Sequence, residues 1–147
     1  MTIRRPRDAA ELDAALALRE AVFAGEQGVP VAADRDGRDD EALHVVAVGD
    51  DGAVLATCRV LLDGGAARLG RLCVAPAARR RGLASAVLAE AEREARAAGA
   101  GRMVLHAQTS ALVLYEQAGY LPRGERFMEE GIEHLMMVKP LTEPRHA

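Results

Sequence analysis

Residues 79–85 combine a basic cluster with a glycine, and such a combination suits the binding of a phosphate group. They are Arg79, Arg80, Arg81, Gly82, Leu83, Ala84 and Ser85. A long amphipathic segment begins at the glycine, so the cluster lies at the start of a predicted helix. There, unpaired N–H groups and the helix dipole attract anions. We interpret this stretch as the pyrophosphate site of a bound cofactor, with a solvated basic turn as the alternative.

The composition limits the class of protein. The 147 residues are 50% hydrophobic and carry a net charge of −3, so we expect one globular domain over 1–147 with a loose tail at about 142–147. The negative charge argues against a nucleic-acid binder. Cys58 and Cys73 are too few for a disulfide framework or a cysteine-based zinc site, and we predict two buried free thiols and no metal. No secretory signal and no run of about 20 apolar residues is present, so we expect a cytoplasmic protein without membrane contact.

Hydrophobic periodicity predicts an alternation of helices and short strands. Three of the strands are joined by Asp/Gly turns and should form an antiparallel meander. A strand that follows a long helix should run parallel to the strand before that helix. The predicted elements are a strand at 2–6, a helix at 8–23, strands at 43–48, 54–62 and 68–74, a helix at 82–98, a strand at 103–107, a helix at 109–118, and a hairpin of 120–128 with 133–139.

The helix at 82–98 has one apolar and one charged face. The predicted buried stripe contains Ala84, Val87, Leu88, Ala91, Ala95 and Ala98. The residues expected to face solvent are Glu90, Glu92, Arg93, Glu94 and Arg96.

The segment 25–40 is rich in acids and turn formers and predicts a loop with at most one helical turn. Two interpretations remain open. The acids either form a solvated loop, or they line a substrate entrance and attract a cationic amine. A calcium loop is disfavoured because the stretch lacks the remaining ligands and the terminal Glu at the required spacing.

Two motifs in the expected element order resemble those of the GNAT superfamily of N-acyltransferases. The first is Arg79-x-x-Gly82-x-Ala84 after a strand ending in Val-Ala-Pro, which resembles the acetyl-CoA signature. The second runs from Gln108 to Tyr120 and resembles the later strand-to-helix motif, although the family usually carries Asn where this chain has Gln108. The segment 18–30, together with the late Glu-Gly-Ile-x-His at 130–134, is similar to the ElaA-type branch.

This resemblance implies an α+β fold with helices on both faces of a mixed, mostly antiparallel sheet. The sheet is expected to splay between the strands 68–74 and 103–107, and acetyl-CoA to bind in the splay. The pantetheine arm is expected along Leu72, Cys73 and Val74. The pyrophosphate is expected on N–H groups of Arg81, Gly82, Leu83, Ala84 and Ser85, supplemented by Arg79 and Arg80. Gln108 is the last residue assigned to the cofactor site.

Acyl transfer to an amine needs a base for the amine, donors for the oxyanion and a proton for the departing thiolate. Tyr115 matches the family's general acid by position, and a backbone N–H near Cys73 or Val74 would stabilise the oxyanion. His134 ranks first as the base because it lies in the closing hairpin. The alternatives are His44 and His106, and any of these histidines can instead be structural. Glu26, Glu129 and Glu130 are loop acids that can bind the amine or act through water, and we select Glu26 and Glu130 as substrate ligands.

The leading hypothesis is therefore an N-acetyltransferase that moves an acetyl group from acetyl-CoA to a small-molecule or peptide amine within a ternary complex. The alternative is an acyl-CoA-binding sensor without turnover. We expect acetyl-CoA and an amine acceptor as partners, no nucleic acid, and a homodimer as one candidate assembly.

Overall fold

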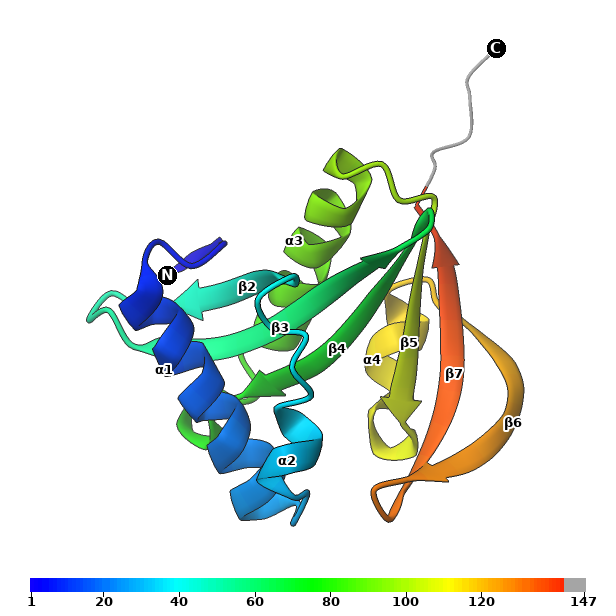
Figure 1. Cartoon of the computed structure of the whole chain (residues 1–147), viewed down its shortest axis with the longest axis horizontal. Coiled ribbons are helices and arrows are strands. Elements are labelled where there is room, and N and C mark those ends of the chain that lie inside the picture. The colour runs from blue at the N-terminus through cyan, green and yellow to red at the C-terminus, as the bar shows by residue number, and fades with distance from the viewer. Residues whose placement is uncertain (142–147) are drawn as a thin grey trace.

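Seven strands form one sheet in the computed structural model, which describes residues 1–141 (Figure 1). The strand order is β1-β2-β3-β4-β5-β7-β6, and only the β4–β5 pair is parallel. The predicted meander, the parallel strand and the closing hairpin are all confirmed. The strands are β1 Thr2–Arg4, β2 Leu43–Val48, β3 Val54–Asp63, β4 Ala66–Val74, β5 Arg102–Gln108, β6 Leu121–Glu129 and β7 Ile132–Pro140.

The parallel pair is short, and this opens the sheet. Strand β4 pairs with β5 only from Ala66 opposite Arg102 to Leu69 opposite Leu105. Beyond that point the two strands diverge, and the sheet takes the V shape seen in Figure 1. The ends of β4 and β5 therefore have unpaired ladder edges that face each other, as the predicted splay requires.

A β-bulge in β4 lies where the divergence begins. Thr57 pairs with Cys73 and Arg59 with Gly70, so Arg71 and Leu72 together lie opposite the single residue Cys58. Arg71 adopts a left-handed φ of 56°, which is uncommon for a residue other than glycine. Such a bulge redirects side chains and backbone groups locally.

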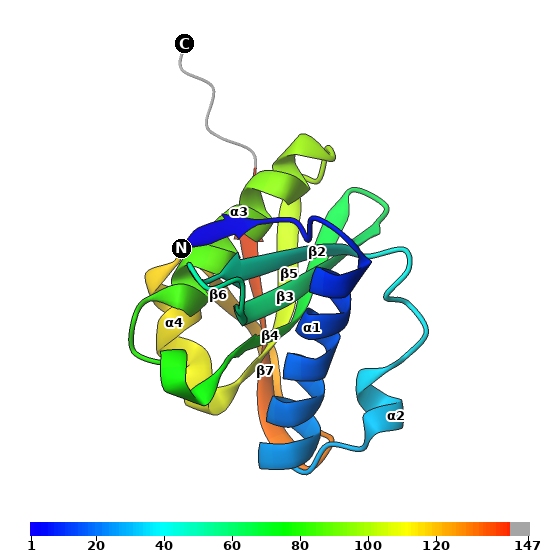
Figure 2. The same ribbon diagram turned by 90° about the vertical axis from the view of Figure 1, so that its left-hand side faces the viewer.

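Helices cover both faces of the sheet (Figures 1 and 2). Helix α1 (Ala9–Arg19), the π-helix η1 (Glu20–Glu26) and the short α2 (Val31–Asp34) lie on one side. Helices α3 (Leu83–Ala97) and α4 (Leu112–Gln117) lie on the other, each preceded by a 3-10 turn, η2 (Pro76–Ala78) and η3 (Thr109–Ala111). The side chain of Asp8 caps α1 by accepting from the N–H of Glu11 at 2.9 Å, as its spacing predicted. The loop 25–40 contains one helical turn, as expected.

Helix α3 shows two errors of the sequence analysis. Val87, Leu88, Ala91 and Ala95 are buried as predicted, but Ala98, expected in the buried stripe, is exposed because it lies at the C-cap beyond the last helical turn. Glu92 is only 6% exposed. Its carboxylate accepts hydrogen bonds from the Tyr120 hydroxyl and the Lys139 ammonium, both at 2.9 Å. The prediction of a solvent-facing Glu92 is wrong because β7 and the start of β6 cover this flank of the helix.

The remaining sequence predictions for the fold concern the two cysteines and the C-terminal tail. Cys58 and Cys73 are buried free thiols, as predicted. The predicted loose tail at 142–147 lies outside the described residues. Within residues 1–141, no helix has the length and apolar character needed to cross a membrane.

Candidate active site

A cavity of about 500 Å³ lies between the diverging ends of β4 and β5. One wall comes from β3, the β4 bulge and the segment around α2, and the other from β5 and the β6–β7 hairpin. Tyr115 of α4 and Phe23 of η1 contribute from the two helical layers. The splay thus creates one solvent-open cavity that is lined by side chains from both halves of the sheet.

Tyr115 lines this cavity and is 7% exposed. Its ring packs edge-to-face on Tyr120, with centroids 5.8 Å apart. Its hydroxyl forms no hydrogen bond with any residue in the described part of the chain. Burial raises the pKa of the Tyr115 phenol above its usual value of about 10, so the hydroxyl stays protonated and can donate a hydrogen bond into the cavity.

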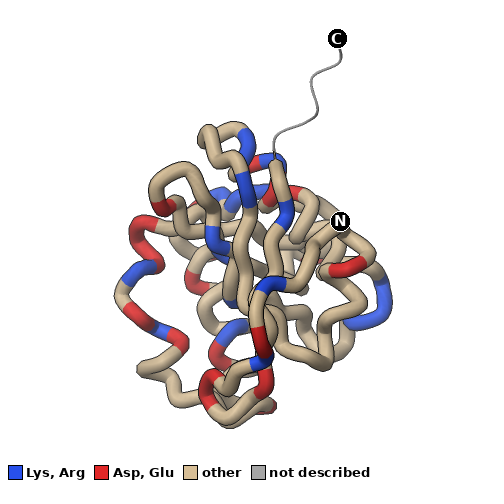
Figure 3. Tube along the Cα trace, turned by 90° about the vertical axis from the view of Figure 1, so that its right-hand side faces the viewer, with Lys and Arg blue, Asp and Glu red and all other residues tan. Residues whose placement is uncertain are grey.

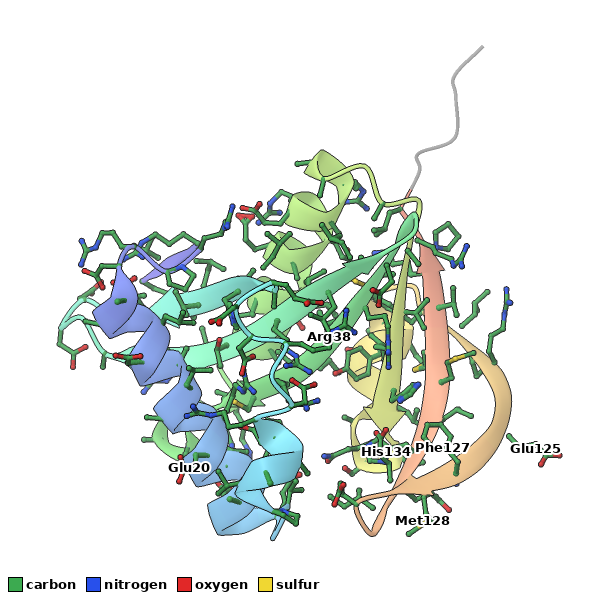
Figure 4. The ribbon with its side chains drawn as sticks, in the orientation of Figure 1. Glu20, Arg38, Glu125, Phe127, Met128 and His134 are labelled. Carbon is green, nitrogen blue, oxygen red and sulfur yellow. The ribbon has the colours of Figure 1, made fainter. Side chains whose placement is uncertain are left out.

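His134 lines the cavity from the opposite half of the sheet. Its Nδ1 lies 2.7 Å from the carbonyl oxygen of Ile132. A carbonyl only accepts, so Nδ1 carries the hydrogen in the neutral ring and Nε2 presents a lone pair. Figure 4 shows the imidazole beside Phe127, on which it stacks at a centroid distance of 5.9 Å. The ring is therefore held in one orientation with a free basic nitrogen.

Glu129 lies between two imidazoles at the mouth of the cavity. Its Oε2 is 3.6 Å from Nε2 of His134, and its Oε1 is 3.3 Å from Nδ1 of His106. If His134 takes up a proton at Nε2, the carboxylate of Glu129 is close enough to stabilise the imidazolium. His44, the third candidate base, does not line the cavity, and its Nε2 lies 2.9 Å from the carbonyl oxygen of Asp39.

Most acids of the loop 25–40 that reach the cavity are paired with arginines from other elements. Arg19 of α1 is buried and contacts Asp34 (Nε to Oδ1, 3.3 Å) and Asp39 (Nη1 to Oδ1, 2.7 Å). Arg59 of β3 binds Asp36 through both terminal nitrogens and reaches Asp39 at 3.1 Å.

Arg71, the residue in the β4 bulge, joins the same network. Its guanidinium lies 3.3 Å from Oδ1 of Asp34, 3.4 Å from Oδ2 of Asp36 and 3.0 Å from the carbonyl oxygen of Ala33. The network therefore ties the loop 25–40 to the bulge. One buried oxygen of the cluster, Oδ2 of Asp34, has no hydrogen-bond partner among the described residues.

These contacts change the acidity of the loop. The hydrogen bond from Arg59 lowers the pKa of Asp36 well below its usual range. For Asp39, burial favours the neutral acid, but the hydrogen bonds and charges of Arg19 and Arg59 outweigh burial and lower its pKa. Three arginines (Arg19, Arg59, Arg71) bind three aspartates (Asp34, Asp36, Asp39), and Arg35 at the edge of this cluster lies 3.7 Å from Asp34 and 3.9 Å from Glu20, so that four cations face four anions and their formal charges cancel.

The turn before α3 has free backbone donors. Gly82 takes a left-handed φ of 74° at the N-cap of α3, and no side chain caps the helix. The first N–H to reach a backbone carbonyl is that of Ala86, which bonds to Gly82 at 3.1 Å. The N–H groups of residues 80–85 donate to no acceptor within the described chain, so this turn presents a ring of unpaired donors.

Two contacts connect η1 to both sides of the splay. Arg79 donates from Nε to the carbonyl of Val74 at 3.1 Å and pairs with the carboxylate of Glu26 at 2.9 and 3.0 Å. Gln108, at the end of β5, donates to the side-chain oxygen of Gln27 at 2.8 Å. The end of η1 thus bridges the open end of the V.

Comparison with known proteins assigns the family. Residues 10–141 match the family model described as an acetyltransferase (GNAT) domain. This chain belongs to the GNAT acetyltransferase family. The uncharacterized N-acetyltransferase YjcF of Bacillus subtilis is 34% identical over 130 residues, which are 88% of this chain and 92% of that protein.

Two solved structures show the same fold over nearly their full length. An acyl-CoA N-acyltransferase from Pseudomonas aeruginosa is 30% identical, with a TM-score of 0.81 over 94% of this chain and 97% of that one. Escherichia coli ElaA is 25% identical, with a TM-score of 0.82 over 94% of this chain and 97% of that one. The predicted GNAT fold, its enzyme class and the likeness to ElaA are confirmed, and the family uses acetyl-CoA.

The structure of this GNAT enzyme groups the predicted site residues in two places. Tyr115, His134, Leu72, Gln108 and Glu130 line the cavity. Arg79, Arg80, Arg81, Gly82, Leu83, Ala84 and Ser85 form the turn at the start of α3. Cys73, Val74 and Glu26 do not line the cavity, and Glu26 pairs with Arg79 instead.

Sequence reasoning missed the bulge at Arg71 and the arginine–aspartate cluster. The positive φ of Arg71 has no sequence signal, since such positions normally attract glycine or asparagine. The arginines come from three elements far apart in the chain, and single-residue patterns do not reveal such pairs.

Proposed function

We propose that this enzyme transfers an acetyl group from acetyl-CoA to a primary amine of a small molecule or peptide, directly and within a ternary complex. The observation that carries the proposal is that Tyr115 and His134 both line one cavity at the splay, from opposite halves of the sheet. Each presents a group suited to one of the two proton movements that the reaction needs.

The residues at the start of α3 fit the cofactor. Unpaired N–H groups at 80–85 and the left-handed Gly82 suit a pyrophosphate, with Arg80 and Arg81 nearby as cations. The unpaired edge of β4 at Leu72, Cys73 and Val74 suits the amides of a pantetheine arm. Arg79 occupies the Val74 carbonyl and must release it for that contact. When bound, acetyl-CoA supplies an activated acetyl thioester.

His134 is the proposed base. Its Nε2 lone pair accepts one proton from the attacking amine, and the imidazolium so formed faces the Glu129 carboxylate. His106 holds Glu129 from the other side and is a positioning residue. Glu130 lines the same end of the cavity and suits the binding of an ammonium group before it loses its proton. Glu26, bound to Arg79, is the weaker of the two predicted substrate ligands.

Tyr115 is the proposed donor to the leaving sulfur. As the new C–N bond forms and the C–S bond breaks, the phenol donates its proton to the departing sulfur. Tyr115 regains a proton from the second N–H of the former ammonium group, and the proton first taken by His134 returns to solvent. Because burial raises the Tyr115 pKa, the phenol stays protonated until negative charge develops on the sulfur. An N–H beside the bulge, near Cys73 or Val74, is the proposed oxyanion donor.

Cys73 is a poor nucleophile here, which supports direct transfer. Burial raises the pKa of its thiol to about 12, so little thiolate exists at neutral pH. Its sulfur has no histidine or carboxylate hydrogen-bond partner among residues 1–141, and it does not line the cavity. A covalent acetyl-cysteine route would need an activating base beside it.

Thiol release from acetyl-CoA over a panel of amines tests the proposal. We expect acceptor-dependent release, and Cys73→Ala should retain it, with Cys58→Ala as the matched buried-thiol control. Loss of release in Cys73→Ala alone would refute direct transfer. Acetyl-CoA binding without release over the whole panel would favour the alternative, a non-catalytic acyl-CoA-binding module.

A further inference from the structure

The geometry points to an acceptor that carries an anionic group in addition to its amine, and it assigns the anion to Arg68. This inference rests on the proposed function and names the class of its second substrate. It replaces the expectation that the loop 25–40 attracts a cation, because the charges of the cavity are distributed differently from those of the sequence.

The acidic loop offers no net negative field to the cavity. Asp34 and Asp36 line the cavity, but both belong to the cluster in which three aspartates face three arginines. An incoming cation would compete there with guanidinium groups already in place at close range. The loop therefore holds the wall together and is poorly suited to bind a second cation.

Arg68 is the one arginine lining this wall that has no acidic partner among the described residues. Four arginines line the cavity, namely Arg38, Arg59, Arg68 and Arg71. Arg59 and Arg71 are in the cluster, and Arg38 binds Glu41 and Asp63. Arg68 forms no ion pair or side-chain hydrogen bond with any of residues 1–141. Its guanidinium is free to bind a carboxylate or phosphate through two parallel hydrogen bonds.

The opposite wall is acidic, which separates the two ends of the cavity by charge. Glu129 ends β6 and Glu130 follows it in the turn to β7, and neither contacts a lysine or arginine within the described chain; Glu129 contacts the imidazoles of His106 and His134. Figure 3 shows acidic residues in this turn at the lower end of the molecule and basic ones higher along the strands. The cavity thus has an anionic end beside the base His134 and a cationic end at Arg68.

Sheet register gives the spacing between these ends. Arg68 pairs with Val104, and His134 pairs with Gln108, four residues further along β5. At about 3.3 Å per residue, the two levels are about 13 Å apart. The Arg68 side chain can shorten this span, so an amine at His134 and an anion at Arg68 fit a molecule longer than a simple α-amino acid. Arg38 and His134, both labelled in Figure 4, line the same cavity.

A series of ω-amino acids, from glycine to aminooctanoate, together with their neutral carboxamides, tests this directly. Binding to the protein saturated with coenzyme A is measured by calorimetry, and acetyl transfer from acetyl-CoA by thiol release. We expect the longer acids to bind about tenfold or more tightly than their amides, as one charge-assisted contact allows. Arg68→Gln should abolish that preference, and Arg68→Lys should restore part of it.

Arg93→Gln is the matched control, because Arg93 is an exposed arginine on α3 that pairs only with Glu90 in the described chain. It should keep the preference for acids. Equal binding of acids and amides, or a preference that survives Arg68→Gln, would overturn the inference. Arg68-dependent binding without thiol release would leave the anion site standing and refute the transfer reaction, so the two proposals fail separately.

Discussion

Replacing Tyr115 with Phe should reduce turnover without weakening the fold. Tyr115 lines the cavity and its hydroxyl makes no hydrogen bond to the described chain, so removal of the hydroxyl breaks no hydrogen bond within residues 1–141. The ring remains and keeps its edge-to-face packing on Tyr120. The change therefore removes only what the hydroxyl does for a bound substrate.

The expected loss of turnover follows from the free energy of the hydrogen bond that is removed. A hydrogen bond to a charged atom contributes about 1.5–3 kcal/mol. If the phenol donates to sulfur that carries charge only in the transition state, kcat should fall by about 10- to 100-fold while the Kd for acetyl-CoA stays the same. The melting temperature should change by no more than about 2 °C.

Tyr120→Phe is the natural control because it removes the neighbouring hydroxyl. That hydroxyl donates to the buried Glu92 at 2.9 Å, so its loss leaves a carboxylate with one partner fewer. The expected cost is about 1–3 kcal/mol, or a melting temperature lower by about 3–10 °C, with kcat nearly unchanged. A stopped thiol-release assay measures kcat, calorimetry with acetyl-CoA measures its Kd, and thermal unfolding measures the melting temperature.

The reasoning fails if Tyr115→Phe retains wild-type kcat, since the phenol would then take no part in the chemistry. It also fails if Tyr115→Phe loses as much stability as Tyr120→Phe, because the hydroxyl would then have a structural partner.

Three further predictions concern other parts of the site. His134→Gln should lower kcat/KM at least 100-fold in the thiol-release assay; a wild-type kcat/KM in this variant would exclude His134 as the base. Gly82→Ala should raise the Kd for acetyl-CoA in calorimetry and cost about 1 kcal/mol in urea unfolding, because φ is 74° there. The ion pair with Arg59 keeps the pKa of folded Asp36 below its unfolded value of about 3.9. The stability from this pair is complete above about pH 5 and is lost as the pH falls toward the folded pKa; Asp36→Asn should flatten that acid limb in urea titrations at several pH values.

Much of the fold could be predicted because its signals are local. The turns Asp50-Asp51-Gly52 and Asp63-Gly64-Gly65 separate strands whose alternation is clear, and Gly82 marks the start of α3. The parallel crossover follows from a helix between two strands. Glu92 was misplaced because its burial depends on Lys139 and Tyr120, which approach α3 only in the folded chain.

The candidate site was predicted in part for the same reason. Tyr115 was proposed from the strand-to-helix motif and His134 from its place in the closing hairpin, but their positions on opposite sides of one cavity depend on the splay. Glu129 and His106 could be named as acid and base candidates, whereas the contact between them requires the register that pairs β5 with β7 and β7 with β6. Residue type thus suggested candidate chemistry, and the sheet register decides which candidate groups are neighbours.

The charge of the cavity illustrates why counting residues misleads. The loop 25–40 contains many acids, and counted alone they predict attraction of a cation. A carboxylate already bound to a guanidinium contributes little field at a distance, however, because the paired charges cancel. The charges that the proposed acceptor would meet are those not paired with an opposite formal charge, and among the described residues that line the cavity we infer these to be Arg68 on one wall and the two glutamates Glu129 and Glu130, of which Glu129 contacts only histidines, on the other. Since pairing depends on which elements become neighbours, the electrostatics of the acceptor side are a property of the fold, and the family resemblance alone does not determine them.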